Sequence, residues 1–319
     1  FKSYPRNQLI MKLIIQIPCL NEEDYLGQTI DDLPKKIDGI DKIEILIIND
    51  GSTDNTLKVA KNKKVNHIVS FSKQKGLAYA FSAGLNKCLE LGADIIVNTD
   101  ADNQYQGRYI KNLVSPIIKN ESDIVIGVRD TDAIEHFSVI KKFLQKIGST
   151  VVRYLSGTSV SDATSGFRAF SKDAAMRLNR YNSFTYTLDT IIQAGHKNIA
   201  ISTTPIKTNP DLRPSRLVKS TFRYVIRNAI GIVRIFLIYR SFQTIFYIGL
   251  ILFSAGFLLG LRYIYLMSMD DGAGNVQSLI LSAILLTSGF ISFLSAILAD
   301  KISTVRQILE EKTYKINKI

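Results

Sequence analysis

The sequence of 319 residues contains only two cysteines and no tryptophan. Because Cys19 and Cys88 have no paired spacing, the sequence excludes a disulfide framework and a cysteine-based metal cluster, and is typical of a reducing compartment. No nucleic-acid-binding motif, internal repeat or low-complexity tract occurs, so we expect no nucleic acid among the partners. Phe1–Ile10 lack the apolar run of a signal peptide. We expect Met11 to be the natural start and residues 1–10 to be an extra segment.

Charged and apolar residues are unevenly distributed along the chain. Lys and Arg number 40 against 28 Asp and Glu, a net charge of +12, and the excess lies beside two uncharged segments, 242–261 and 276–299. Each segment can cross a bilayer, since about 20 helical residues span ~30 Å. The connector Ser268–Asn275 holds Asp270 and Asp271 but no Lys or Arg, whereas both outer flanks are basic. The positive-inside rule therefore predicts a multi-pass protein of the cell (inner) membrane, with its N-terminal domain and C-terminal tail in the cytoplasm.

Up to about Pro205, short apolar runs alternate with helical patterns, which predicts an α/β domain with a mainly parallel sheet. Such sheets bind ligands at the carboxyl ends of their strands. Asp50, Asp100, Asp102 and Arg129 all follow predicted strand ends, so we expect them to share one site. The expected strands are Leu13–Ile17, Ile43–Ile48, His67–Phe71, Ile95–Asn98 and Ile124–Val128, and helices are expected after Asn21, around Leu57–Ala60 and over Leu77–Leu91.

A polar, proline-containing stretch follows the α/β domain and leads into a basic amphipathic pattern. Five basic residues fall on one narrow helical stripe opposite an apolar face, which suits a helix lying on a membrane surface among lipid phosphates. The alternative is a basic helix packed on the protein itself. The stripe is formed by Arg216, Lys219, Arg223, Arg227 and Arg234. The predicted organisation is an extra segment (1–10), the α/β domain (11–206), a juxtamembrane amphipathic region (207–240), two transmembrane helices (241–299) and a cytoplasmic tail (300–319).

Four short motifs occur in order within the α/β domain. They are Ile17-Pro18-Cys19-Leu20-Asn21-Glu22-Glu23, Ile48-Asn49-Asp50-Gly51-Ser52-Thr53-Asp54-Asn55-Thr56, Asp100-Ala101-Asp102-Asn103-Gln104-Tyr105 and Ala163-Thr164-Ser165-Gly166-Phe167-Arg168-Ala169-Phe170. The ordered set resembles family-two glycosyltransferases. The last motif resembles a block of the polyprenyl-phosphate branch, the dolichyl-phosphate-mannose-synthase-like enzymes, several bacterial members of which also have two C-terminal spans. The resemblance implies a GT-A fold and a nucleotide-diphosphate-sugar donor.

The resemblance implies roles for residues of the first three motifs. Asp50 is expected to accept a hydrogen bond from the base, because a carboxylate only accepts and uracil and guanine carry ring N–H donors. The alternative reading of Asp50-Gly51-Ser52 is a turn with a helix cap. Asp100, Asp102 and Gln104 are expected to hold Mg²⁺ or Mn²⁺, since hard cations take oxygen ligands. The nucleotide-sugar site is expected to comprise Pro18, Asn21, Glu22, Asp50, Ser52 and Asp100.

The acceptor implied by the resemblance is a polyprenyl phosphate, whose ionised phosphate needs cations more than a general base. Guanidinium groups bind phosphate through two donors. Asp162 is expected near the metal and Asp189 in a structural or orienting role. The expected catalytic residues are Asp102, Asp162, Arg129 and Arg168, and the expected acceptor-phosphate residues are Arg129, Arg168, Arg213, Ser215 and Arg216.

The functional expectation is a metal-dependent, inverting hexosyltransferase of cell-envelope glycan synthesis. It would move one sugar from a UDP- or GDP-sugar to undecaprenyl or dolichyl phosphate on the cytoplasmic leaflet, with membrane lipids and a homo-oligomer as further partners. Two alternatives are transfer to another acceptor, such as a glycolipid or polysaccharide, and a non-catalytic membrane scaffold. Without tryptophan the chain has no Q-x-x-R-W motif of processive synthases, and Asn49 replaces the common first Asp of the second motif.

Overall fold

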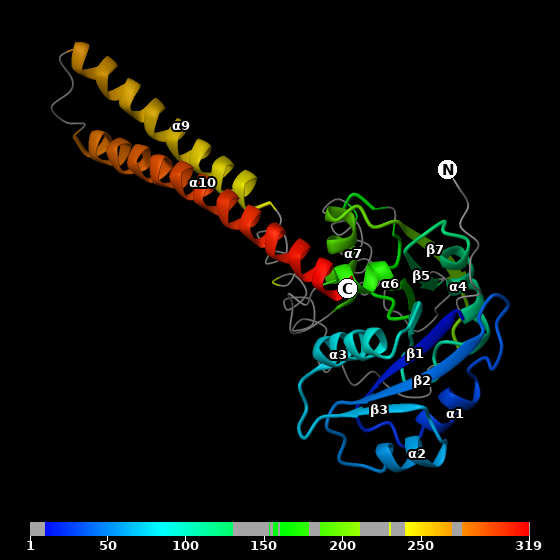
Figure 1. Cartoon of the computed structure of the whole chain (residues 1–319). Coiled ribbons are helices and arrows are strands. Elements are labelled where there is room, and N and C mark those ends of the chain that lie inside the picture. The colour runs from blue at the N-terminus through cyan, green and yellow to red at the C-terminus, as the bar shows by residue number, and fades with distance from the viewer. Residues whose placement is uncertain are drawn as a thin grey trace, which may run out of the picture. The chain divides into compact units, whose positions relative to one another are not determined.

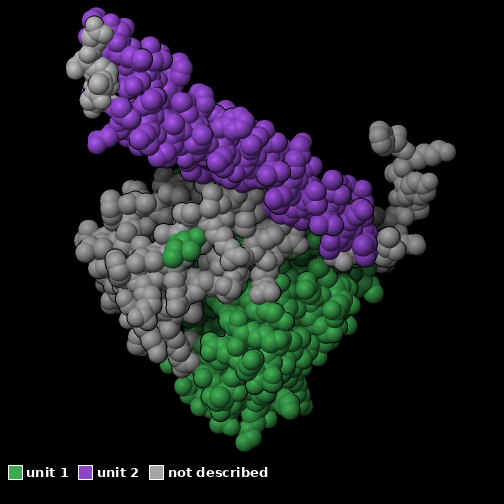
Figure 2. All heavy atoms as spheres, turned by 90° about the vertical axis from the view of Figure 1, so that its left-hand side faces the viewer, with its two compact units in different colours: residues 1–232 green, residues 233–319 purple. Residues whose placement is uncertain are grey.

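The computed structural model describes residues 10–129, 153, 156–158, 160–178, 186–210, 230, 240–269 and 276–318 (Figure 1). The chain divides into two compact units, residues 1–232 and 233–319 (Figure 2). The division falls within the juxtamembrane region predicted from the sequence. Each unit is described by itself below.

The first unit is built on one sheet, which has seven strands among the described residues, in the order β3-β2-β1-β4-β6-β5-β7. All neighbouring strands are parallel except β6, which runs antiparallel to both β4 and β5. A nearly parallel sheet covered by helices explains the continuous apolar strands of the sequence. The strands are β1 (Lys12–Cys19), β2 (Lys42–Asn49), β3 (His67–Ser70), β4 (Ile95–Asn98), β5 (Ile124–Arg129), β6 (Arg168–Ser171) and β7 (Ile201–Ile206).

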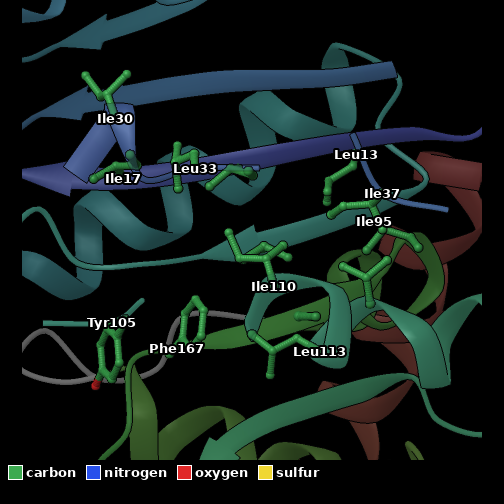
Figure 3. Packing of buried hydrophobic residues seen from close by; sticks show 14 of the residues in the cluster. Leu13, Ile17, Ile30, Leu33, Ile37, Ile95, Tyr105, Ile110, Leu113 and Phe167 are labelled. Carbon is green, nitrogen blue, oxygen red and sulfur yellow. The ribbon is translucent and has the colours of Figure 1, made fainter. Parts of the chain in front are cut away.

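Helices pack on the two faces of this sheet and bury its side chains (Figure 1). Leu13, Ile15 and Ile17 of β1 belong to the main apolar core. In that core Tyr105 and Phe167 stack with ring centroids 5.0 Å apart (Figure 3). The helices of the first unit are α1 (Leu26–Asp31), α2 (Thr56–Asn62), α3 (Leu77–Glu90), the short η1 (Gly107–Tyr109), α4 (Ile110–Ile118), α6 (Lys172–Arg177) and α7 (Thr187–His196).

The second unit consists of two helices that pack along each other, α9 (Ser241–Ser268) and α10 (Val276–Lys318). Both are long and apolar enough to cross a membrane. Most of their large apolar side chains are exposed, as expected for surfaces that face lipid rather than a protein core. The helix α10 continues well past the predicted span end at Ala299, so part of the predicted tail is helical and continuous with the span.

The five predicted strands are all present within one or two residues of their expected ends. The prediction of helices after Asn21, around Leu57–Ala60 and over Leu77–Leu91 is confirmed by α1, α2 and α3. Sequence analysis missed β6, because three of its four residues belong to the fourth motif, which was interpreted only for its chemistry, and it also missed β7. The amphipathic stripe beginning at Arg216 lies outside the described residues.

Candidate active site

The carboxyl ends of β1, β2 and β4 meet at one edge of the sheet. Cys19 at the end of β1 lies opposite Asn49, and Gln16 lies opposite Asn98 at the end of β4. The antiparallel strand β6 begins opposite Asn98, so the 163–167 segment reaches the same edge. Strand register therefore brings all four sequence motifs to the edge at which the sequence predicted Asp50, Asp100 and Asp102 to meet.

The first two motifs are joined by hydrogen bonds between side chains and backbone. The Asn21 N–H donates to Ser52 Oγ at 3.0 Å, and the Thr53 N–H donates to Asn21 Oδ1 at 2.8 Å. The Glu22 N–H donates to Thr56 Oγ1 at 2.8 Å. Asn21 and Ser52 thus hold the two loops in register, and their predicted contact with a nucleotide stays a prediction. Pro18 is buried within β1 opposite Ile48.

Asp50 is buried and anchors the loop that precedes α3. Its Oδ1 accepts from the Lys75 N–H at 2.7 Å, and its Oδ2 accepts from the Gly76 N–H at 2.8 Å. Gly51, at φ +74°, is pressed against this loop, since a Cβ there would lie 2.6 Å from the Gln74 nitrogen. A base N–H can therefore bind Asp50 only at a lone pair that the two amides leave.

Asp100 and Asp102 form a pair of carboxylates on the loop after β4. Burial and the charge of Asp102 raise the pKa of Asp100 to about 7, with a further contribution from Glu22, while Arg129 opposes the shift. Two like charges so close favour a cation between them. The described residues hold no group of three or more His, Cys, Asp or Glu side chains placed for a metal. A divalent cation fits here only if other oxygens, such as those of a diphosphate, complete its shell.

The loop carrying these carboxylates is held from two sides. Thr29 Oγ1 of α1 donates to the Ala101 carbonyl at 2.9 Å. On the other side, the Asn209 N–H donates to the Gln104 carbonyl at 2.8 Å, and Asn209 Nδ2 donates to the Asn103 carbonyl at 2.8 Å. The Gln104 N–H donates to Asp102 Oδ1 at 3.2 Å, so this residue orients the carboxylate through its backbone.

Arg129, the last residue of β5, forms a charged pair beside the carboxylate loop. Its Nε and Nη2 donate to Asp162 at 2.8 and 3.1 Å, and Nη2 also donates to Thr164 Oγ1 at 2.9 Å. Burial alone would raise the pKa of Asp162, but the adjacent guanidinium outweighs it and lowers that pKa. Asp162 is 2% exposed and Arg129 18% exposed at the side chain, so the arginine presents the accessible surface of the pair.

Arg168 corrects an expectation from the sequence, which placed it on the acceptor phosphate. Its side chain is fully buried. Its guanidinium donates to the carbonyls of Ser165 (2.7 Å), Thr187 (2.8 Å) and Ala163 (3.0 Å) and to Thr190 Oγ1 (2.6 Å). Burial lowers its pKa to about 10. A side chain without exposed surface cannot contact a phosphate, so Arg168 holds the 163–168 segment together instead.

Several residues that shape the site escaped sequence analysis. Asn98 and Gln16 are polar positions within apolar strands, and that irregularity was the available signal. Tyr105 ended the third motif but was given no role, and Tyr186 carried no signal, because its hydrogen bond joins it to Asn98, far away in the sequence. Asp189 is buried in the first turn of α7. Arg213, Ser215 and Arg216 lie outside the described residues.

Comparisons with known proteins agree with this architecture. Residues 14–178 match the family model "Glycosyl transferase family 2". A Methanococcus voltae UDP-N-acetylglucosamine--dolichyl-phosphate N-acetylglucosaminyltransferase is 31% identical over 216 residues, covering 60% of this chain and 83% of the relative. The Micrococcus luteus undecaprenyl-phosphate mannosyltransferase is 28% identical over 170 residues, covering 51% and 68%.

The fold is also that of a solved enzyme. The Mycobacterium tuberculosis glucosyl-3-phosphoglycerate synthase, in complex with Mn²⁺, UDP-glucose and phosphoglyceric acid, superposes with a TM-score of 0.53 at 20% identity, covering 70% of this chain and 79% of that one. The catalytic unit therefore has the GT-A fold that the sequence predicted.

Proposed function

The chain belongs to glycosyl transferase family 2, and from that premise we propose that it transfers one sugar from a UDP- or GDP-sugar to a polyprenyl phosphate. Relatives that act on dolichyl or undecaprenyl phosphate support this acceptor. Two helices suited to a bilayer give the enzyme access to such a lipid. The proposed setting is the cytoplasmic leaflet, and the proposed product is a lipid-linked sugar.

One observation carries the proposal: the carboxylate pair Asp100 and Asp102 lies beside the Arg129–Asp162 pair. Arg129 is close enough to lower the pKa of Asp100. A carboxylate pair suited to a cation, which would neutralise the charge of a diphosphate, thus adjoins a cationic group for a second phosphate. Two anionic substrates can be brought together only where such charges are compensated.

We assign the donor side to the edge formed by β1, β2 and β4. The loops at this edge are held by Asp50, Asn21 and Ser52. Glu22 lies close enough to Asp100 to raise the pKa of that carboxyl. Asp100 and Asp102, with the Gln104 backbone orienting the second, would hold Mg²⁺ or Mn²⁺. When bound, such a cation neutralises charge that develops on the departing nucleoside diphosphate.

We assign the acceptor side to Arg129, which Asp162 and Thr164 hold in a fixed orientation. A phosphate monoester is largely ionised at neutral pH, because its second pKa is about 6. Its oxygen can therefore attack the anomeric carbon without a protein base, and a single in-line displacement inverts that centre. Asn209 is hydrogen-bonded to the carboxylate loop, and Arg213 follows it by four residues, about 14 Å when fully extended. Arg213, Ser215 and Arg216 therefore stay as proposed acceptor contacts.

The test is transfer of a radiolabelled sugar in detergent. Purified protein would be given UDP- or GDP-sugars, Mn²⁺ and either a polyprenyl phosphate or another acceptor. We expect label in the polyprenyl-phosphate fraction only, and its loss with a chelator. Asp102→Asn should lower kcat by at least about 100-fold, whereas Asp173→Asn should not, because the Asp173 side chain is partly exposed on α6 and pairs with Arg177 of the same helix. Label in another acceptor, or full activity of Asp102→Asn, would refute the proposal.

A further inference from the structure

A buried amide pair interrupts the apolar central strands of the sheet. Gln16 of β1 and Asn98 of β4 are both fully buried. Gln16 Nε2 donates to Asn98 Oδ1 at 2.9 Å. Polar side chains cost free energy when they are buried, so such a pair close to the active-site loops calls for an explanation.

Asn98 directs its amide toward the fourth motif. Its Nδ2 donates to the Gly166 carbonyl at 2.8 Å and to Tyr186 Oη at 2.9 Å. With Gln16 on its oxygen, every polar atom of the Asn98 side chain is engaged, which fixes the orientation of the amide. Tyr186 is itself fixed, because its ring stacks on Phe81 with centroids 3.9 Å apart.

Gly166 lies directly against the Asp100 carboxylate. A Cβ at this position would lie 3.1 and 3.2 Å from the two Asp100 carboxylate oxygens and 2.8 Å from Tyr186 Oη. The Gly166 N–H donates to Tyr105 Oη at 3.2 Å. Both polar groups of the Gly166 backbone are thus held by side chains, and its Cα forms one wall of the space that the Asp100 carboxylate occupies.

We propose that Asn98 is a positioning residue, which through Gly166 and Tyr186 fixes the Asp100 carboxylate in the orientation that a divalent cation requires. The inference rests on the proposed function in that Asp100 is taken to hold the cation. Groups that hold a metal ligand in place commonly contribute tenfold or more to metal affinity. An amide suits this position, because it can donate to two acceptors and accept from Gln16 at once.

Two variants separate positioning from simple stability. Tyr186→Phe keeps the ring on Phe81 but removes the oxygen that contacts Asn98 and borders Gly166. Asn98→Leu removes all three hydrogen bonds at similar volume. The matched control is Ser171→Ala at the other end of β6, opposite Ile95, which loses hydrogen bonds to Asp123 and to the Ala174 N–H but touches none of these groups.

The measurement is the affinity of the full chain for Mn²⁺ in detergent with UDP or GDP present. Electron paramagnetic resonance detects the bound Mn²⁺. We expect Tyr186→Phe and Asn98→Leu to weaken Mn²⁺ binding by about tenfold. Ser171→Ala should bind Mn²⁺ with wild-type affinity, even if its melting temperature falls as much as that of Tyr186→Phe or Asn98→Leu. Should Asn98→Leu fail to fold, Tyr186→Phe decides.

If Tyr186→Phe binds Mn²⁺ with wild-type affinity, the inference is overturned. It is also overturned if the wild-type protein binds no Mn²⁺ in the presence of UDP or GDP. Because this readout needs no acceptor, it is independent of the transfer assay. A wild type that binds Mn²⁺ but transfers nothing to polyprenyl phosphate would refute the proposed function, and the weakened binding of the two variants would still support the positioning role.

Discussion

At the scale of single residues, the burial of Arg168 decides what this side chain can do. Its guanidinium donates to the carbonyls of Ala163, Ser165 and Thr187, which lie in different directions. A lysine in its place would have three donors on a single nitrogen and could not reach all of these carbonyls. Arg168→Lys should therefore leave buried carbonyls unpaired and lower the free energy of unfolding by about 3 kcal/mol. Circular dichroism during denaturant unfolding measures this. Unchanged stability with a raised KM for the acceptor would instead indicate direct phosphate contact.

At the scale of elements, the amino ends of the first three strands are joined by one buried carboxylate. Glu44 of β2 contacts Lys12 (2.8 Å), Lys42 (2.7 Å) and His67 (2.8 Å), which begin β1, β2 and β3. Burial alone would raise the pKa of Glu44, but these hydrogen bonds lower it from 4.5 to about 2. This cluster lies at the sheet edge opposite the site, so it affects stability and not chemistry.

The lowered pKa of Glu44 predicts a pH dependence with a definite sign. The ionised form is favoured by folding, so its stabilisation is complete above about pH 4.5 and is lost as the pH falls toward 2. Glu44→Gln should cost about 2 kcal/mol at neutral pH, and the difference from wild type should shrink over that interval. Unfolding curves at a series of pH values test this. Parallel pH profiles for the two proteins would contradict it.

The two apolar helices approach closely at glycines, which predicts an asymmetry between two neighbouring positions. A Cβ on Gly256 would lie 2.9 Å from the Leu286 nitrogen and 2.9 Å from Leu285 Cβ, whereas a Cβ on Gly260 would lie 2.9 Å from one side-chain atom only, Ser282 Oγ. Gly256→Ala should therefore separate α9 from α10, and Gly260→Ala should not. Spin labels at exposed Leu258 and Ile284 report the distance between the helices. Equal distances in both variants would contradict this packing.

The sequence predicts an element when the signal for it is local, and misses an element that depends on residues far away in the sequence. β4 matched its expected bounds, because a short apolar run before two acids is a local signal. β6 pairs antiparallel with strands far away in sequence, and no local pattern announces that pairing. The same holds for Arg168, whose partners are mainly backbone carbonyls. The extension of α10 was accessible in principle, since 300–318 contain no Gly or Pro.

At the scale of the whole molecule, the chain passes from the site toward its apolar helices through a segment tied to the carboxylate loop. Thr208 forms a bridge with Tyr105, and Asn209 holds the same loop through Asn103 and Gln104. Thr208 and Asn209, which precede the apolar helices in the sequence, are thus fixed to the loop proposed to hold the donor diphosphate.

The charge distribution around the two apolar helices predicts how the molecule lies in the bilayer. Arg240 precedes α9, and Lys301, Arg306, Lys312 and Lys315 follow the second span, while the connector carries Asp270 and Asp271. Cations favour the cytoplasmic side, so both outer flanks should face the cytoplasm and the connector the opposite side.

Cysteine labelling can test this orientation. Cys19 and Cys88 are buried, so only cysteines introduced at exposed positions should react. In intact cells a membrane-impermeant maleimide should label Met269→Cys but not Lys312→Cys, and in inverted vesicles the pattern should reverse. Labelling of Lys312→Cys in intact cells would place the catalytic unit away from cytoplasmic nucleotide sugars and refute this orientation.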